Sequence, residues 1–327
     1  MKKGKGLLIF AARRLLLSIP TLLLVISAVF LLVHLAPGDP VAILAGEGAI
    51  GDEYLANIRA EYDLDKPLYV QYLKYMAKII TGDFGTSFRY RMPVTELIAE
   101  RLPATLVLML GAIVVFVGAG ILLGVFASKK PNSPFDVSLS ICSVIGWSTP
   151  LFWLGQILII VFSLKLGWLP AQGMYSVTSN AQGIERLPDL GLHLILPLIT
   201  LGMRYLAMGA RMTRASMLEV LSEDYIITAK SKGLADKLVL YRHAIPNALL
   251  PVITLVGMNI GTMLTGSVLT EVVFGWPGMG RLLYDGIYAR DYPLVIGIVI
   301  TVSIAVVVCN FITDVLYAYI DPRIKYR

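Results

Sequence analysis

The sequence predicts an all-α polytopic membrane protein with six transmembrane helices, and three observations lead to this fold class. Of the 327 residues, 57% are hydrophobic and only 15% are charged, whereas a water-soluble domain usually carries about 25% charged residues. The apolar residues are gathered in runs without a polar face, which is typical of helices surrounded by lipid. Each run is long enough to cross a bilayer, because about 20 helical residues span roughly 30 Å of hydrocarbon.

Six apolar runs meet this length. Five contain no charged residue, and the sixth is interrupted only by Arg204, which lies towards one end, where a long side chain can reach the headgroup layer. We interpret Arg204 as a residue of that kind, or as an interhelix hydrogen-bond donor, rather than as a substrate ligand. The six runs are Leu15–Leu35, Leu102–Ser128, Val137–Leu164, Leu190–Ala210, Ala244–Thr270 and Tyr292–Thr313.

The first run is predicted to be an uncleaved anchor. It follows a basic stretch that ends at Arg13 and Arg14, as a signal peptide would, but its apolar run is longer than the usual 7 to 15 residues. Residues 1–35 are therefore assigned to a cytoplasmic N-terminus and the first span.

The charges between the spans predict the orientation. With six spans, segments 1–14, 129–136, 211–243 and 314–327 share one side and carry 16 Lys and Arg against 7 Asp and Glu. The opposite segments carry 11 against 15. Because cationic loops resist translocation, we expect a multi-pass protein of the cell membrane with both termini in the cytoplasm. No basic stripe with interleaved aromatic residues supports nucleic-acid binding.

Residues 36–101 are predicted to form an extracytoplasmic helical insertion. The Pro37–Pro40 turn ends the first span, because proline stops a helix. Two short helices are expected, one over Asp52–Tyr62 and one over 70–80 that stops before Gly82. A second external segment, 271–291, is rich in glycine at 275–280 and is expected to form a re-entrant or mouth-lining loop with a short amphipathic stretch.

The cytoplasmic segment 211–243 contains a short charged helix. Glu223 and Asp224 stand at its start, Lys230 and Lys232 near its end, and Gly233 just after it. This order matches the helix macrodipole and the usual glycine stop. A short helix that faces the cytosol between two spans is interpreted as an attachment point for a partner protein.

Several kinds of chemistry have no motif here. The sequence lacks a phosphate-cradling G-x-x-x-x-G-K-[ST] loop, H-E-x-x-H, C-x-x-C and G-x-S-x-G. Its three histidines are scattered, and both cysteines, Cys142 and Cys309, fall within predicted spans. None of the six runs contains the acid that ion-coupled carriers place in the membrane. A transporter of this composition must therefore take its energy from another polypeptide.

The cytoplasmic segment resembles the EAA loop of ABC importer permeases. Ile227-Thr228-Ala229 stands at the E-A-A position, Gly233 is in register, and His243-Ala244-Ile245-Pro246 stands at the I-x-L-P position. Other stretches resemble the dipeptide, oligopeptide and nickel branch of these permeases, and the resemblance covers nearly the whole chain. Among them are Ala36-Pro37-Gly38-Asp39-Pro40, Gly82-Asp83-Phe84-Gly85-Thr86-Ser87, Asn247-Ala248-Leu249-Leu250-Pro251, Phe274-Gly275-Trp276-Pro277-Gly278-Met279-Gly280 and Asp321-Pro322-Arg323.

The resemblance implies a type I ABC importer permease whose coupling helix contacts an ATPase. Residues 102–318 would be the core permease domain with an EAA-like coupling loop at 211–246, and 319–327 a cytoplasmic tail. The implied partners are a second homologous permease, two cytoplasmic ABC ATPase subunits, an extracytoplasmic solute-binding protein and the lipid bilayer. ATP and Mg would bind the ATPases, so this chain would hold no cofactor and would not be an enzyme. The residues assigned to ATPase coupling are Glu223, Asp224, Tyr225, Ala229, Lys232, Gly233 and Leu234.

The cargo and the energy source leave alternatives open. Di- or oligopeptides are the expected cargo, with nickel or oligosaccharides as alternatives within the same family. An ion-coupled secondary transporter would need an acid within a span, and a polytopic membrane enzyme would need clustered His, Asp or Cys at the membrane surface. The sequence does not identify the residues that line the substrate path.

Overall fold

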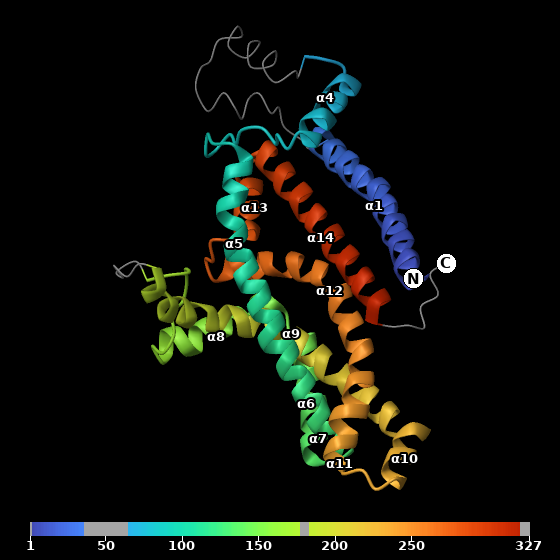
Figure 1. The fold of residues 1–327 in the computed structure, drawn as a ribbon. Helices are drawn as coiled ribbons and strands as arrows, with labels where there is room; N and C mark the ends of the chain where they lie inside the picture. Colours follow the sequence, from blue (N-terminus) through green and yellow to red (C-terminus); the bar gives the residue numbers. More distant parts are fainter. Residues whose placement is uncertain (1, 36–64, 177–182, 321–327) are drawn as a thin grey trace.

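The computed structural model describes residues 2–35, 65–176 and 183–320, and these form helices and turns without a strand (Figure 1). The fold class expected from the sequence is confirmed. The predicted insertion helix Asp52–Tyr62, the Pro37–Pro40 turn and the tail from Asp321 lie outside the described residues. The elements are α1 (Lys2–Leu35), α4 (Leu68–Ile80), α5 (Val94–Ala112), α6 (Gly118–Lys129), α7 (Pro134–Ser148), α8 (Leu151–Leu158), α9 (Leu187–Leu221), α10 (Asp224–Ser231), α11 (Asp236–Leu238), α12 (Ile245–Val273), α13 (Met279–Tyr288) and α14 (Tyr292–Ile320), with π-helical turns at Ile113–Val117, Ile159–Lys165 and Val239–Ala244 and a 3-10 turn at Gly183–Arg186.

Within the described residues, five helical segments are long and apolar enough to cross a membrane, and a bent pair of helices makes a sixth candidate. The helix of the second span begins at Val94, before the expected boundary at Leu102, because Pro93 starts a helix whose first turns carry Glu96 and Glu100. The segments are Phe10–Leu32, Val94–Lys129, the pair Pro134–Ser148 and Leu151–Lys165, Gly183–Leu221, Asp236–Gly261 and Tyr292–Val315.

The bent pair differs from the single helix expected over Val137–Leu164. Helices α7 and α8 meet at an angle of 104°. Thr149 between them is extended, and Pro150 stands directly before α8. Proline has no N–H to continue the α7 hydrogen-bond ladder and disfavours helical backbone in the residue before it. The apolar run therefore contains two helices rather than one.

Glycines bring the long helices close together. A Cβ added to Gly120 would lie 2.7 Å from the Leu206 carbonyl oxygen, and one added to Gly124 would lie 2.6 Å from the Ala210 oxygen. Helix α6 thus touches the backbone of α9, as small residues at a spacing of four permit. Between α12 and α14, a Cβ on Gly261 would lie 2.9 Å from Val306.

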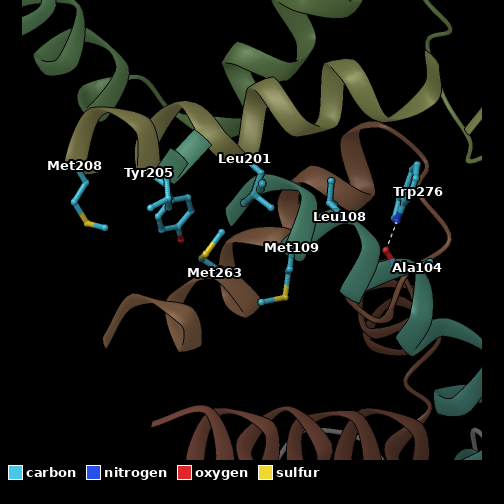
Figure 2. Close-up of a cluster of buried hydrophobic side chains, with 10 residues drawn as sticks. Ala104, Leu108, Met109, Leu201, Tyr205, Met208, Met263 and Trp276 are labelled. Atoms are coloured by element: carbon cyan, nitrogen blue, oxygen red, sulfur yellow. Dashed lines mark hydrogen bonds between the residues drawn. The ribbon is translucent and has the colours of Figure 1, made fainter. Parts of the chain in front are cut away.

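A buried cluster joins α5, α9 and α12 at the centre of the protein (Figure 2). Leu108 and Leu201 are fully buried, and Met263 approaches them from α12. The indole N–H of Trp276 donates to the Ala104 carbonyl over 2.8 Å, which attaches the 274–278 loop to α5. In lipid, such side-chain packing and interhelix hydrogen bonding hold helices together, because the tails are as apolar as the side chains.

Helix α4 confirms the second helix expected in the insertion, and Gly82 follows it with a φ of +78°. The side of α4 that carries Tyr72 packs against α1. The hydroxyls of Tyr72 and Ser27 are joined by a 2.7 Å hydrogen bond, and the ring centroids of Tyr72 and Phe30 lie 5.3 Å apart. Helix α1 in turn lies beside α14 (Figure 1), where Arg14 and Asp314 form a 2.9 Å ion pair.

The segment 271–291 contains the end of α12, a glycine-rich turn and the helix α13, and a buried acid connects them. Glu271 belongs to the last turn of α12 and has no exposed surface. Its carboxylate accepts hydrogen bonds from the backbone N–H groups of Gly280 and Arg281, at the start of the amphipathic helix α13, over 2.7 and 3.1 Å. A carboxylate at a helix N-terminus satisfies free N–H groups and complements the helix dipole.

Candidate functional site: the helix between α9 and α12

Helix α10 lies at one end of the protein, together with α11 and the turn between α6 and α7 (Figure 1). Helix α4 and the first turn of α5 lie at the other end. Helix α9 runs without a break to Leu221, past the end of its predicted span at Ala210, and so carries α10 away from the apolar part of the molecule. Each end of α10 is thus connected by a few residues to a long candidate span.

The N-terminus of α10 is charged but has no side-chain cap. Glu223 occupies the N-cap position with extended backbone, and its carbonyl accepts the N–H groups of Ile226 and Ile227 over 3.0 and 3.2 Å. Asp224 follows in the first turn and is exposed. The two carboxylates therefore favour the helix through the positive end of its dipole.

The C-terminus is closed by a Schellman motif around Gly233. The N–H of Gly233 donates to the Lys230 carbonyl over 2.9 Å, and that of Leu234 donates to the Ala229 carbonyl over 3.4 Å. Gly233 has a φ of +78°, in the left-handed region that favours glycine. A Cβ at this position would meet no atom within 4 Å, so the backbone conformation, and not a close neighbour, favours glycine here. Lys232, at the C-cap position, is exposed.

Two apolar side chains attach α10 to the rest of the protein. Ile226 is fully buried and Ala229 retains only 8% of its surface. Their spacing of three places both on one face of the helix. They belong to one buried cluster that also contains Val125 of α6, Met217 of α9, Val239 and Ala244 of the π-helical turn, and Ala248 of α12.

Away from this cluster, α10 and its C-terminal turn present apolar side chains outward. Ile227 is 54% exposed, Tyr225 is 41% exposed and Leu234 is 36% exposed. The Tyr225 hydroxyl accepts a hydrogen bond from the Asn247 amide over 3.2 Å, so it also connects α10 to the first turns of α12. A charged helix with exposed apolar side chains at its centre is suited to contact another protein.

The neighbouring turn is held by an ion pair between α7 and α9. Arg214 donates through two nitrogens to the carboxylate of Asp136, with Nη2 at 2.6 Å from Oδ2. Asp136 is almost fully buried and also accepts the N–H of Asn132 over 2.9 Å. The bidentate geometry fixes both side chains. The first turn of α7 is therefore fastened to the part of α9 that leads to α10.

The structure brings the seven residues predicted for coupling together on one short helix and its C-terminal turn. Ala229 is an anchor, whereas Glu223, Asp224, Tyr225, Lys232 and Leu234 are exposed and Gly233 forms the stop. Two further residues of this helix were not assigned to coupling from the sequence, the buried Ile226 and the exposed Ile227, although Ile227 stands at the E-A-A position. The apolar pair at Ile226 and Ala229 was the available signal, because its spacing indicates a buried face.

Comparison with known proteins identifies the family. The family model described as binding-protein-dependent transport system inner membrane component matches residues 120–326, and its N-terminal companion matches residues 7–109. This chain belongs to that family. The family consists of inner membrane components, so the chain is an inner membrane protein with several membrane-crossing helices.

Members of the family with similar sequences match it over nearly their whole length. The di/tripeptide transport system permease protein DppB of Pseudomonas aeruginosa is 43% identical and covers 98% of this chain and 100% of its own. The oligopeptide transport system permease protein AppB of Bacillus subtilis is 42% identical, over 97% and 99%. The glutathione transport system permease protein GsiC of Salmonella paratyphi A is 41% identical, over 97% and 99%. Among solved structures, a methionine ABC transporter in an inward-facing conformation gives a TM-score of 0.48 at 18% identity, over 70% of this chain and 94% of that one.

Proposed function

We propose that this inner membrane component is a permease subunit of an ATP-driven importer of di- or oligopeptides. The family supports a binding-protein-dependent transporter, and the names of the three relatives above describe systems that transport dipeptides, tripeptides, oligopeptides or glutathione. All of these are short peptides. Peptide cargo is therefore favoured over nickel or oligosaccharide.

The proposed complex contains three further kinds of subunit. A second homologous permease completes the translocation path, two ABC ATPases bind ATP and Mg on the cytoplasmic side, and a solute-binding protein delivers cargo from the opposite side. Within the described residues of this chain, no group of three or more His, Cys, Asp or Glu side chains is arranged to hold a metal. The permease itself contributes movement rather than bond-breaking chemistry.

The observation that carries the proposal is the way α10 is attached. One face holds Ile226 in a cluster shared by α6, α9 and α12, while the other presents Ile227 outward. A push on the exposed face is transmitted to two membrane-crossing helices, because packed side chains are incompressible at this scale. ATP-driven closure of the ATPase pair would move α10, and α9 and α12 would rock between inward- and outward-facing arrangements.

The proposal assigns α10, the turn between α6 and α7 and both termini to the cytoplasm. Segments on that side hold the excess of Lys and Arg, and in Figure 1 α10 and the turn between α6 and α7 lie together at one end of the protein. Residues 36–101 then lie outside the cell membrane.

The alternative of ion-coupled transport has less support from the geometry. The buried acids Asp136, Glu271 and Asp291 each stand one residue outside a predicted span, and donors of this chain already contact both oxygens of each. A coupling ion would have to displace these hydrogen bonds. Glu271 is therefore interpreted as a structural residue.

Uptake by the reconstituted complex tests the proposed function. The full chain, its paired permease, both ATPases and the binding protein are placed in proteoliposomes with a labelled dipeptide. We expect uptake that needs ATP and the binding protein, persists when ionophores collapse ion gradients, and is not inhibited by nickel or maltooligosaccharides. Uptake driven by an ion gradient without ATP would overturn the proposal.

A further inference from the structure

A groove between the end of α6 and the start of α7 has the composition of a phospholipid site. It is a shallow, widely open groove of about 460 Å³ with mostly apolar walls. Aliphatic and aromatic side chains form one part of the lining, while two lysines and a serine form the rest. The lining residues are Leu123, Phe126, Lys129, Lys130, Ser133 and Phe135.

The groove lies at the level where hydrocarbon meets headgroups. The apolar segment Val94–Lys129 ends at the first lysine, and the next apolar helix begins at Pro134. The turn between two such helices must lie at the surface of the bilayer. Phe126 and Phe135 are 56% and 47% exposed, so their rings face the surroundings of the protein on either side of the turn.

The positive charge of the groove is not neutralised by the chain around it. No ion pair to Lys129 or Lys130 occurs among the residues that the structure describes. The acid nearest to these lysines in the sequence, Asp136, is buried and bound to Arg214 and to the N–H of Asn132. The ammonium group of Lys129 lies 4.8 Å from the centre of the Phe126 ring, so a cation–π contact holds it at the rim.

We propose that this groove binds an anionic phospholipid. Lys129 and Lys130 attract the phosphate, the Ser133 hydroxyl is available to donate to it, and Leu123, Phe126 and Phe135 contact the first carbons of an acyl chain. A soluble phosphate would leave the apolar walls uncovered, and an acidic protein segment would meet an aromatic wall at bilayer level. The charge of the rim and the apolar walls together match a lipid that has an anionic headgroup.

The site has a consequence for the neighbouring part of the fold. The Ser133 hydroxyl accepts the N–H of Asp136, and Asp136 holds Arg214 of α9. A lipid bound at Lys129 and Lys130 therefore contacts the turn that is fastened to α9. This inference does not rest on the proposed transport function, because either orientation of the chain leaves the groove at a bilayer surface.

Lipid retention by the purified complex tests the proposal. The full chain with its partner subunits is titrated in detergent with phosphatidylglycerol, and bound lipid is counted by native mass spectrometry. The variant K129Q/K130Q is compared with K78Q/K165Q, which removes the same charge from exposed positions outside the groove. Since each lysine near an anionic surface contributes about 1 kcal/mol, we expect K129Q/K130Q to bind the tightest phosphatidylglycerol about 30-fold more weakly.

Further measurements in the same experiment separate the sources of the anion. Phosphatidylcholine should be retained equally by all variants, and millimolar glycerol phosphate should not displace phosphatidylglycerol. Equal phosphatidylglycerol retention by K129Q/K130Q and K78Q/K165Q would overturn the proposal. Displacement by glycerol phosphate would instead show a soluble-anion site, and loss of ATPase subunits without loss of lipid would show a protein contact; either result would also overturn it.

Discussion

Thr105 of α5 donates its hydroxyl proton to the carboxylate of Glu271 on α12 over 2.7 Å, and both side chains are buried. The same hydroxyl accepts the backbone N–H of Met279 over 2.8 Å. The end of α12 and the start of α13 are therefore joined to α5, which is far from both in the sequence, through two side chains. This junction fixes the start of α13 against α5.

Replacing Glu271 with alanine should destabilise this junction. The N–H groups of Gly280 and Arg281 and the hydroxyl of Thr105 would lose their acceptor, and each buried unsatisfied donor costs about 1–3 kcal/mol. We expect the free energy of unfolding to fall by about 3 kcal/mol or more, measured by denaturation in detergent. Glu185→Ala, at an exposed position, serves as the control. An unchanged unfolding midpoint for Glu271→Ala would contradict a structural role for the carboxylate.

Arg204 stacks on Trp147 between α9 and α7, with its guanidinium carbon 4.3 Å from the ring centre. A lysine keeps the cation, so Arg204→Lys should insert and support transport at nearly the wild-type rate. In a double-mutant cycle, Arg204→Met and Trp147→Leu should show a coupling of about 1 kcal/mol in unfolding stability. A coupling energy near zero would show that the contact between Arg204 and Trp147 does not stabilise the protein. Severe transport loss in Arg204→Lys with normal insertion would indicate a bidentate contact that lysine cannot reproduce.

Cysteine labelling tests the orientation. Cys142 and Cys309 are first replaced by serine, and single cysteines are introduced at Asn57, outside the described residues, and at the exposed Ser231 of α10. The excess of positive charge on the α10 side predicts that an impermeant thiol reagent reaches position 57 from outside intact cells and position 231 only after lysis. Labelling of both positions from the same face would refute the six-span topology.

Gly233 should tolerate asparagine but not valine. Its φ of +78° costs most L-residues about 1–2 kcal/mol, whereas asparagine adopts this region more readily. No atom lies within 4 Å of an added Cβ, so the expected strain comes from the backbone conformation rather than from a Cβ clash. In the reconstituted complex, we expect Gly233→Val to lose the ATPase response to loaded binding protein and to lose uptake, while Gly233→Asn retains most of both. Wild-type stimulation in Gly233→Val would require the coupling element to lie elsewhere.

The sequence was informative where a local rule determines the structure. Apolar runs predicted the membrane-crossing helices, and the order of acids, lysines and Gly233 predicted α10 and its stop. Pro150 was also visible, but an apolar run long enough for one span obscured the break between α7 and α8. Lipid-facing composition is the same for a straight helix and for a bent pair, so length alone could not separate them.

The contacts between distant segments could not be predicted from the sequence. Glu271 stands one residue after an apolar run, and nothing local shows that Thr105 and the N–H groups at 280 and 281 surround it. Asp136 and Arg214 are likewise separated by 78 residues. Such partners are set by helix packing, which follows here from close approaches at Gly120 and Gly124.

The central claim is that the exposed face of α10 contacts an ATPase subunit. A photo-reactive benzoylphenylalanine placed at Ile227, which is 54% exposed, should crosslink to the ATPase in the assembled complex. The same group at Ile184, which is 83% exposed and lies at the start of the turn before α9, should not. A covalent adduct with the mass of this chain plus one ATPase from position 227 alone is the predicted result. Absence of that adduct from position 227 in an assembled, ATP-hydrolysing complex would contradict the account.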